Sequence, residues 1–255
     1  MLFLIGLGLG TKDLSLRAID EIKRADDLFL ETYTAFLPKG YAEFIEREAG
    51  RKPVPLSRKD LEDDLKKTVA TAKERKVVIL VPGDPLIATT HSIILNEAKS
   101  QHIKTEVIHA PSVFSIAIGE SGLDVYKFGP TATIPFWSER YKPTAFIDSI
   151  NKNLREGQHT LVLLDIDHKN SMPMKIGEAM KILINAISGK EGVTADTKVI
   201  VMANLGRPDR AIIVTEIKEM GKLSKELEGK VLSLIVPGKL SFAEEESLRR
   251  IASIS

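Results

Sequence analysis

The chain of 255 residues contains no cysteine. This absence excludes disulfide bonds, thiolate catalysis and cysteine-ligated zinc, and it fits a cytoplasmic protein. Neither sign of charge dominates, because 36 Lys and Arg residues stand against 35 Asp and Glu residues and leave a net charge of +1. Such a balance offers no broad attraction to a polyanion, so we expect no direct contact with nucleic acid.

Long hydrophobic runs are also missing. No apolar run approaches the roughly 18 residues that a membrane-spanning helix requires, so we expect no membrane contact. The apolar run at the N-terminus has no basic flank and no cleavage-like site, and it is therefore predicted to be a first strand and not a signal peptide. With 43% hydrophobic residues, the chain can bury one large core or two modest ones.

The common catalytic motifs are absent as well. The sequence has no G-x-S-x-G elbow, no Walker lysine loop and no H-E-x-x-H pair, so hydrolase, NTPase and zinc-protease functions lose support. None of the histidines has metal-ligand spacing to another histidine or to a carboxylate, and no metal site is expected. They are His91, His102, His109, His159 and His168. The residues alone identify no catalytic group.

The first half of the chain alternates strand and helix patterns, which is typical of a mostly parallel sheet. Ser15 is predicted to cap the first helix, Gly50 to end the second, and the prolines of residues 51–56 to place that strand at an edge. Expected strands are 2–7, 26–31, 51–56, 76–81 and 104–110, and expected helices are 15–25, 39–50, 58–75 and 86–101.

The pattern changes near Pro111, where we place the boundary between an N-terminal α/β domain, 1–111, and a C-terminal α/β domain, 112–255. In the second half, Ser241 and Glu244 form a predicted capping box at the start of the last helix. Expected strands are 129–136, 159–166, 197–204, 211–217 and 231–238, and expected helices are 112–123, 143–157, 174–189 and 241–253.

Two loops at strand ends indicate a ligand. The first, Gly6-Leu7-Gly8-Leu9-Gly10-Thr11, resembles a dinucleotide fingerprint with a misplaced third glycine, and Glu31 ends the second strand at about the expected distance. A tight turn without a ligand explains the glycines equally well. The second, Pro82-Gly83-Asp84-Pro85, holds a Gly-Asp pair between two prolines that fix the backbone. Asp84 is either an N-cap of the next helix or an acceptor for a ligand hydroxyl or amine.

Residues 134–144 form an aromatic and basic loop that contains the only tryptophan, Trp137. Such a loop suits contact with a macromolecular partner, but its aromatic side chains could equally cover the core.

Taken together, these stretches resemble the tetrapyrrole-methylase superfamily and, within it, the diphthine synthase family. The opening FLIGLGLGTKDLSLRAIDEIKRADDLFLE and the loop PGDPLIATTH resemble the superfamily. LETYTAFL, VIHAPSVFS, GLDVYKFG, HTLVLLDI and LIVPGKLSFAEEESL resemble the narrower family, in its order and over essentially the whole chain. Gly10-Thr11 departs from the usual pattern, in which a large residue and then an acid follow.

This resemblance implies two α/β domains with a cofactor cleft between them, in a homodimer. It implies repeated methyl transfer from S-adenosylmethionine, which leaves S-adenosylhomocysteine, to the amino group of a modified histidine on translation elongation factor 2. It also implies the cofactor-binding residues Leu9, Asp84, Ile87, Ser112, Val113, Leu164, Ala203 and Leu232. We further hypothesise that Thr89, Thr90 and residues 134–144 face the protein substrate.

Three other functions stay open at this point. A methyltransferase of the same superfamily could act on a tetrapyrrole. A nicotinamide-dependent dehydrogenase could use Gly6, Gly8, Gly10 and Glu31, although the third glycine is misplaced. A binding module could hold S-adenosylmethionine without turning it over.

Overall fold

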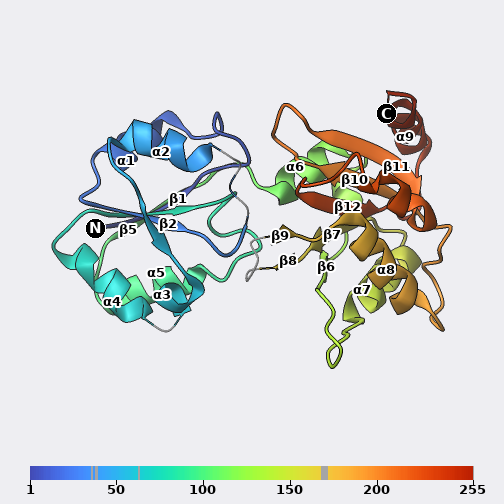
Figure 1. Ribbon diagram of the computed structural model, residues 1–255, viewed down its shortest axis with the longest axis horizontal. Coiled ribbons are helices and arrows are strands. Elements are labelled where there is room, and N and C mark those ends of the chain that lie inside the picture. Colours follow the sequence, from blue (N-terminus) through green and yellow to red (C-terminus); the bar gives the residue numbers. More distant parts are fainter. Residues whose placement is uncertain (36, 38–39, 63, 168–171, 255) are drawn as a thin grey trace. The chain divides into compact units, whose positions relative to one another are not determined.

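The computed structural model describes residues 1–35, 37, 40–62, 64–167 and 172–254. His168, one of the histidines named above, lies outside these residues. The chain forms two compact units, Met1–Val113 and Phe114–Ser255, and both are α/β (Figure 1).

The first unit contains a five-stranded sheet in the order β3-β2-β4-β1-β5, and every neighbouring pair is parallel. This confirms the predicted parallel sheet. The proline-containing strand β3 lies at an edge, as predicted, because a proline cannot complete a central hydrogen-bond ladder. The strands are β1 (Leu2–Gly6), β2 (Asp27–Glu31), β3 (Val54–Leu56), β4 (Val77–Val81) and β5 (Thr105–Ile108).

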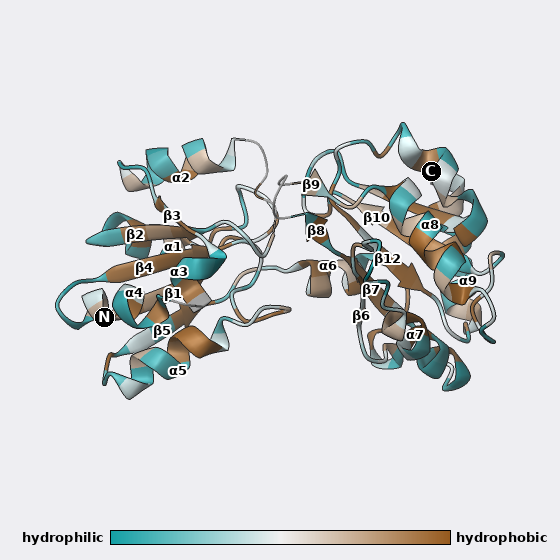
Figure 2. Cartoon of the chain, turned by 60° about the horizontal axis from the view of Figure 1, so that its bottom comes forward, coloured by the Kyte–Doolittle hydropathy of each residue, from teal (hydrophilic) through white to brown (hydrophobic). Residues whose placement is uncertain are grey.

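Helices cover both faces of this sheet (Figure 1). Alternate residues of a strand point to opposite faces, so Phe3 and Ile5 of β1 pack in one apolar cluster while Leu2 and Leu4 pack in another. Both faces are therefore apolar, and the central strands β1 and β4 are brown in Figure 2. One face is covered by α1 (Leu16–Lys23) and α2 (Tyr41–Ala49), the other by α3 (Arg58–Glu62), α4 (Leu65–Ala70), η1 (Thr71–Lys73) and α5 (Ser92–Ser100).

Two helix boundaries were predicted correctly from capping residues. The Ser15 hydroxyl accepts a hydrogen bond from the Ala18 N–H, 3.1 Å away, at the start of α1. Gly50 follows α2 with a left-handed φ of 67°. Two other predictions were wrong: the described residues between 58 and 75 form two α-helices and a 3₁₀ turn instead of one helix, and the helix expected from residue 86 begins only at Ser92.

The second unit contains a five-stranded mixed sheet in the order β11-β10-β12-β7-β6. Its five strands fall in the five predicted segments, and only the β6–β7 pair is parallel. A short antiparallel pair, β8 with β9, and the 3₁₀ segment η3 were not anticipated. The strands are β6 (Ala132–Ile134), β7 (Thr160–Leu164), β8 (Ile166–Asp167), β9 (Met172–Pro173), β10 (Lys198–Ala203), β11 (Ala211–Glu216) and β12 (Leu232–Val236).

One face of this sheet packs against α7, α8 and η3 in a single large apolar cluster. The C-terminal helix α9 contacts β11. The helices are α6 (Val113–Glu120), α7 (Ala145–Arg155), α8 (Ile176–Ile187) and α9 (Phe242–Ile254), with the 3₁₀ segments η2 (Val125–Lys127) and η3 (Ile217–Ser224).

The start of α9 is fastened by the buried carboxylate of Glu244. It accepts hydrogen bonds from the Ser241 N–H at 2.7 Å, as the predicted capping box requires, and from the Asp124 N–H at 3.0 Å. His159 Nε2 lies 2.8 Å from the same carboxylate, and the Lys127 ammonium pairs with it. We call Lys127, His159, Ser241 and Glu244 the α9 clasp.

Candidate cofactor site

Three loops meet at the carboxyl edge of the first sheet, where open α/β sheets bind ligands. The loops after β1 and β4 are joined by two backbone hydrogen bonds between Gly8 and Gly83, of 3.1 and 3.0 Å. A Cβ atom on Gly6 would lie 2.7 Å from the Gly83 carbonyl oxygen and 2.9 Å from the Ala110 Cβ, which belongs to the loop after β5. Only glycine fits at this junction of the three loops.

The first loop is shaped by two side chains that the sequence did not single out. Asp13 Oδ2 accepts hydrogen bonds of 2.8 Å from the N–H groups of both Leu9 and Gly10. The buried Tyr41 hydroxyl donates to the Leu7 carbonyl, and burial raises the pKa of Tyr41, so it remains a donor. Because Asp13 follows Leu9 by only four residues, its hydrogen bonds to this loop could have been predicted from the sequence as part of a turn. The contact of Tyr41 could not, because Tyr41 lies in a helix that is distant in the sequence.

The second loop is organised around Asp84, which is only 6% exposed. Its Oδ1 accepts from the Leu86 N–H at 2.9 Å, and its Oδ2 accepts from His109 Nδ1 at 2.8 Å and from the Ala110 N–H at 3.3 Å. Asp84 therefore links the second loop to the third and does not cap α5. Ile87, from the same loop, is 42% exposed as a residue.

The third loop carries the other two predicted residues of this unit. Ser112 is buried, and Val113 is half-buried where α6 begins. Both follow His109 and Ala110, which Asp84 holds. Five of the eight predicted cofactor residues thus belong to three loops that are hydrogen-bonded or packed together in one unit. Their contact with a cofactor stays a prediction.

His91 is a buried neighbour of the second loop. It lies immediately before α5, not one turn inside a helix as the sequence suggested. Its Nδ1 is 3.2 Å from the Pro85 carbonyl oxygen, and its ring stands edge-on to Tyr33. Burial lowers the pKa of His91 and outweighs the opposing charge of Glu31, which keeps the imidazole neutral beneath the loop.

The three predicted residues of the second unit lie side by side on neighbouring strands. Ala203 ends β10 and pairs with Leu232 at the start of β12, while Leu164 ends β7, whose Leu163 pairs with Ser233. These strand ends share one edge of the second sheet because β12 runs antiparallel to both of its neighbours.

Asn204, which the sequence analysis did not single out, extends that edge. Its N–H donates to the Val231 carbonyl at 2.9 Å, and its Oδ1 accepts from the Val231 N–H at 2.9 Å. The residue adopts a left-handed φ of 47°, a conformation that asparagine tolerates better than most side chains. An Asn-x-Gly sequence after a strand was the available signal.

The carboxylate of Glu31 is occupied by hydrogen bonds within the protein and is not available to bind a ribose. Glu31 is fully buried, and its carboxylate accepts hydrogen bonds from the Thr34 N–H at 2.6 Å, the Thr34 hydroxyl and the Tyr33 N–H. These contacts organise the turn after β2. The dehydrogenase alternative needs this carboxylate for its cofactor, so the structure weighs against it.

The aromatic loop, residues 134–144, has some side chains that cover the core and others that are exposed and could contact a partner. Phe136 and Trp137 pack against the core of the second unit, and Trp137 Nε1 donates to the Pro143 carbonyl at 3.1 Å. Tyr141 is 66% exposed, and Lys142 lies over the Trp137 ring. Of the two threonines assigned to the substrate side, Thr89 bonds to the Pro85 carbonyl at 2.9 Å, whereas Thr90 is exposed.

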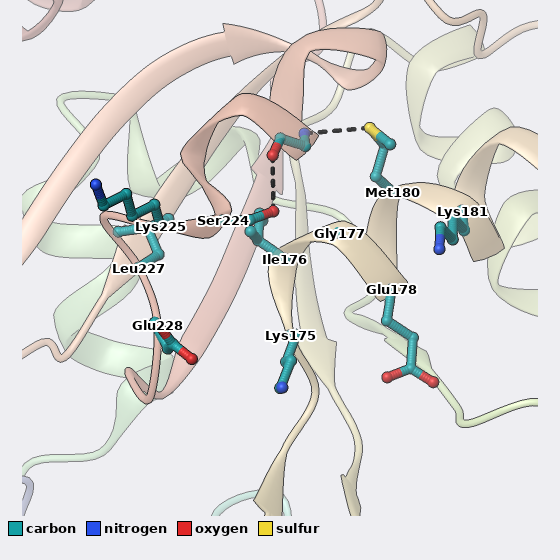
Figure 3. A pocket seen from close by; sticks show the side chains of 11 residues that line it. Lys175, Ile176, Gly177, Glu178, Met180, Lys181, Ser224, Lys225, Leu227 and Glu228 are labelled. Atoms are coloured by element: carbon teal, nitrogen blue, oxygen red, sulfur yellow. Dashed lines mark hydrogen bonds between the residues drawn. The ribbon is translucent and has the colours of Figure 1, made fainter.

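A separate groove of about 790 Å³ lies between the start of α8 and η3, shown in Figure 3. Lysines and glutamates line it together, among them Lys175, Glu178, Lys225 and Glu228, and it includes none of the predicted cofactor residues. The described part of the chain has no cluster of three or more histidine or acidic side chains that could hold a metal ion. Nor does any helix in that part have the length and apolar character needed to cross a membrane.

Comparisons with known proteins agree with these observations. Residues 1–221 match the family model of tetrapyrrole (corrin/porphyrin) methylases. The chain is 38% identical over 254 residues to a diphthine synthase of Methanocaldococcus jannaschii, covering 98% of each chain. It is 36% identical over 255 residues to that of Methanothermobacter thermautotrophicus, covering 99% of this chain and 96% of the relative. A crystal structure of diphthine synthase superposes with a TM-score of 0.89 at 32% identity, covering 99% of this chain and 96% of the other.

Proposed function

Because the chain belongs to the tetrapyrrole methylase family, and within it to the diphthine synthases, we propose that it methylates the modified histidine of translation elongation factor 2. The chain is a methyltransferase of diphthamide biosynthesis. The single observation that carries the finer proposal is the match to diphthine synthases over 98% of both chains, including the loops described above.

The proposed methyl donor is S-adenosylmethionine, and the residues present fit it. Gly83 has no atom within 4 Å of the position of an added Cβ, so a ligand can approach its backbone, and Ile87 beside it is exposed. The residues proposed to hold the cofactor are Leu9, Asp84, Ile87, Ser112 and Val113 in the first unit and Leu164, Ala203 and Leu232 in the second. Asp84 acts by holding its own loop and the next in place.

When bound, the cofactor would supply an electrophilic methyl group, and the acceptor nitrogen would form its N–C bond as the C–S bond broke and the electron pair left with sulfur. Such a displacement depends mainly on alignment, and positioning alone supplies about 7–11 kcal/mol. The work left to the chain is to hold the amine neutral and aimed at the methyl group. This requirement agrees with a sequence that has no G-x-S-x-G elbow, Walker lysine loop or H-E-x-x-H pair.

The acceptor proposed is the amino group of the 2-(3-amino-3-carboxypropyl)histidine of elongation factor 2, methylated repeatedly to give diphthine. A cytoplasmic location and a homodimeric assembly are part of the same proposal. A tetrapyrrole acceptor is the competing proposal within the family. Assays with both acceptors discriminate them, and turnover of either excludes a module that only binds S-adenosylmethionine.

Cofactor binding is tested first, by calorimetric titration with S-adenosylhomocysteine. Asp84→Asn removes a charged acceptor of three hydrogen bonds and should lose about 1–2 kcal/mol, a roughly 5- to 30-fold weaker affinity. Asp26→Asn is the matched control, because Asp26 accepts a backbone hydrogen bond from Lys76 at the opposite edge of the same sheet. Equal effects of the two substitutions would contradict the role of Asp84, and no binding by the wild type would contradict the cofactor.

Turnover is tested next, by mass spectrometry of elongation factor 2 carrying the 3-amino-3-carboxypropyl histidine. Stepwise gain of methyl groups supports the proposal. If elongation factor 2 stays unmodified while a tetrapyrrole is methylated, the proposed acceptor is wrong, and the assignment to the tetrapyrrole methylase family still holds.

A further inference from the structure

His109 and Asp84 form a hydrogen-bonded pair at the carboxyl edge of the first sheet. His109 Nδ1 lies 2.8 Å from Asp84 Oδ2; the His109 side chain is 65% exposed, and that of Asp84 is 7% exposed. The pair joins two of the three loops that carry the proposed cofactor residues. His109 itself stands three residues before Ser112.

The partner fixes the tautomer of a neutral His109. An ionised carboxylate only accepts hydrogen bonds, so Nδ1 carries the proton and Nε2 keeps its lone pair. The buried acid holds one side of the ring, and the His109 side chain as a whole is 65% exposed. A carboxylate that orients an imidazole in this way is the arrangement by which histidine acts as a base.

The proposed reaction needs a base. An aliphatic amine with a pKa of about 8–10 is mostly protonated near neutral pH, and an ammonium has no lone pair for attack. Each methyl transfer also leaves the nitrogen positively charged, so a further transfer requires loss of a proton.

We propose that His109 is the general base that deprotonates the acceptor amine before each methyl transfer; this inference rests on the proposed function. The N–H bond of the ammonium breaks, its electron pair stays on nitrogen, and the proton binds Nε2. The imidazolium that forms is stabilised by Asp84 and gives its proton to water, which its exposure permits. Imidazole takes up and releases protons readily near neutral pH.

The other described histidines do not fit this role. His91 is completely buried under the second loop, and His159 is completely buried in the α9 clasp. His102 is exposed but precedes β5, so it lies at the opposite edge of the sheet from His109, which follows that strand. Among the described residues, Asp84 is the ionisable group in contact with His109, and the strand before it carries Glu106, paired with Arg17.

The test compares His109→Gln with the matched control His102→Asn, which removes the other exposed histidine of this unit and suits its left-handed φ of 58°. The methylation rate of elongation factor 2 is measured from about pH 6.5 to pH 9.5, and S-adenosylhomocysteine affinity is measured in parallel by calorimetry. We expect His109→Gln to lower kcat by about 10²-fold near pH 7, with a deficit that shrinks as the amine loses its proton unaided. Affinity for S-adenosylhomocysteine should stay within about 2-fold, and the control should match the wild type.

A second variant, His109→Gly, leaves room for added imidazole, which should restore part of the rate at neutral pH. A deficit of the same size at every pH, with no rescue by imidazole, would overturn the proposal, as would a rate equal to that of the wild type. A loss of S-adenosylhomocysteine binding would show that His109 only shapes the loop. If the wild type binds S-adenosylhomocysteine but leaves the factor unmethylated, the proposed function fails, and the base role fails with it.

Discussion

At the scale of single residues, Gly8 and Gly83 have nearly the same left-handed backbone but different surroundings. Their φ angles are 70° and 69°. An added Cβ on Gly8 would overlap the Asp13 Cβ and lie 2.8 Å from its Oδ2, whereas one on Gly83 would meet no atom within 4 Å. Gly83→Ala should therefore cost only the backbone strain, about 1–2 kcal/mol. Gly8→Ala should cost at least about 2 kcal/mol more, because it also displaces Asp13 from the Leu9 and Gly10 N–H groups.

Urea denaturation of both variants measures these free energies of unfolding. Equal losses would show that the contact with Asp13 relaxes without cost. The comparison isolates packing from conformation, because the two substitutions are chemically identical and their backbone strain is nearly the same.

At the scale of elements, the α9 clasp predicts how the second unit responds to acid. Burial opposes ionisation of Glu244, but hydrogen bonds from Lys127, the Ser241 and Asp124 N–H groups and His159 outweigh it and hold the pKa of Glu244 well below its usual range. Burial also lowers the pKa of His159, whose Nδ1 accepts from the Gly238 N–H at 2.9 Å. Both groups bind protons more readily when unfolded, so stability should fall on acidification. The fall should start near pH 6.5 with His159 and deepen below about pH 4.3 with Glu244.

Glu244→Gln should lower the free energy of unfolding by about 2–3 kcal/mol at pH 7 and by less at lower pH, because the wild type is then losing the same interaction. Glu245→Gln is the matched control: this neighbouring side chain is exposed, pairs with Arg249 at 3.4 Å, and should change stability by no more than about 0.5 kcal/mol. Thermal unfolding from pH 7 to pH 3 compares the two. A Glu244→Gln deficit that stays constant over this range would refute the electrostatic account of the clasp.

The elements also show where sequence reasoning succeeds. Strands buried on both faces, such as β1 and β4, were predictable because their apolar runs and turn residues have few alternative explanations. Residues 58–75 have a continuous amphipathic pattern, yet the helix breaks. Asp64 leaves helical geometry and its carbonyl starts α4 by accepting from the Lys67 and Thr68 N–H groups. Periodicity alone does not reveal such a local restart.

The delayed start of α5 has a similar cause. Asp84 bonds to the Leu86 N–H, Thr89 and His91 both bond to the Pro85 carbonyl, and Ala88 adopts a left-handed φ of 56°. Local bonds from side chains to the backbone compete with a helix, and they give the loop its fixed shape. Loop contacts that join distant parts of the chain, such as Tyr41 with Leu7, could not be predicted from spacing.

At the scale of the whole molecule, the proposed cofactor residues fall in both units. This distribution predicts which backbone amides a bound cofactor should protect from hydrogen exchange. If one S-adenosylhomocysteine molecule contacts both sets, its binding should slow amide hydrogen exchange in residues 8–10, 83–87 and 112–113 of the first unit. It should also slow exchange in residues 163–165, 202–205 and 231–233 of the second. At 100 times its dissociation constant, a ligand that binds only the folded chain stabilises it by about 2.7 kcal/mol, so protection of up to about 100-fold is expected where local opening releases the ligand.

The groove of Figure 3 supplies the internal control, because residues 175–181 and 224–228 include none of the residues proposed to bind the cofactor. Protection confined to the first unit would remove Leu164, Ala203 and Leu232 from the site and leave the three hydrogen-bonded loops as the whole of it. Protection confined to the second unit would show that the loops of Asp84 and His109 do not bind the cofactor, and it would contradict the roles proposed for both residues. Protection in both, with an unchanged groove, is the result that a methyltransferase drawing on both α/β units requires.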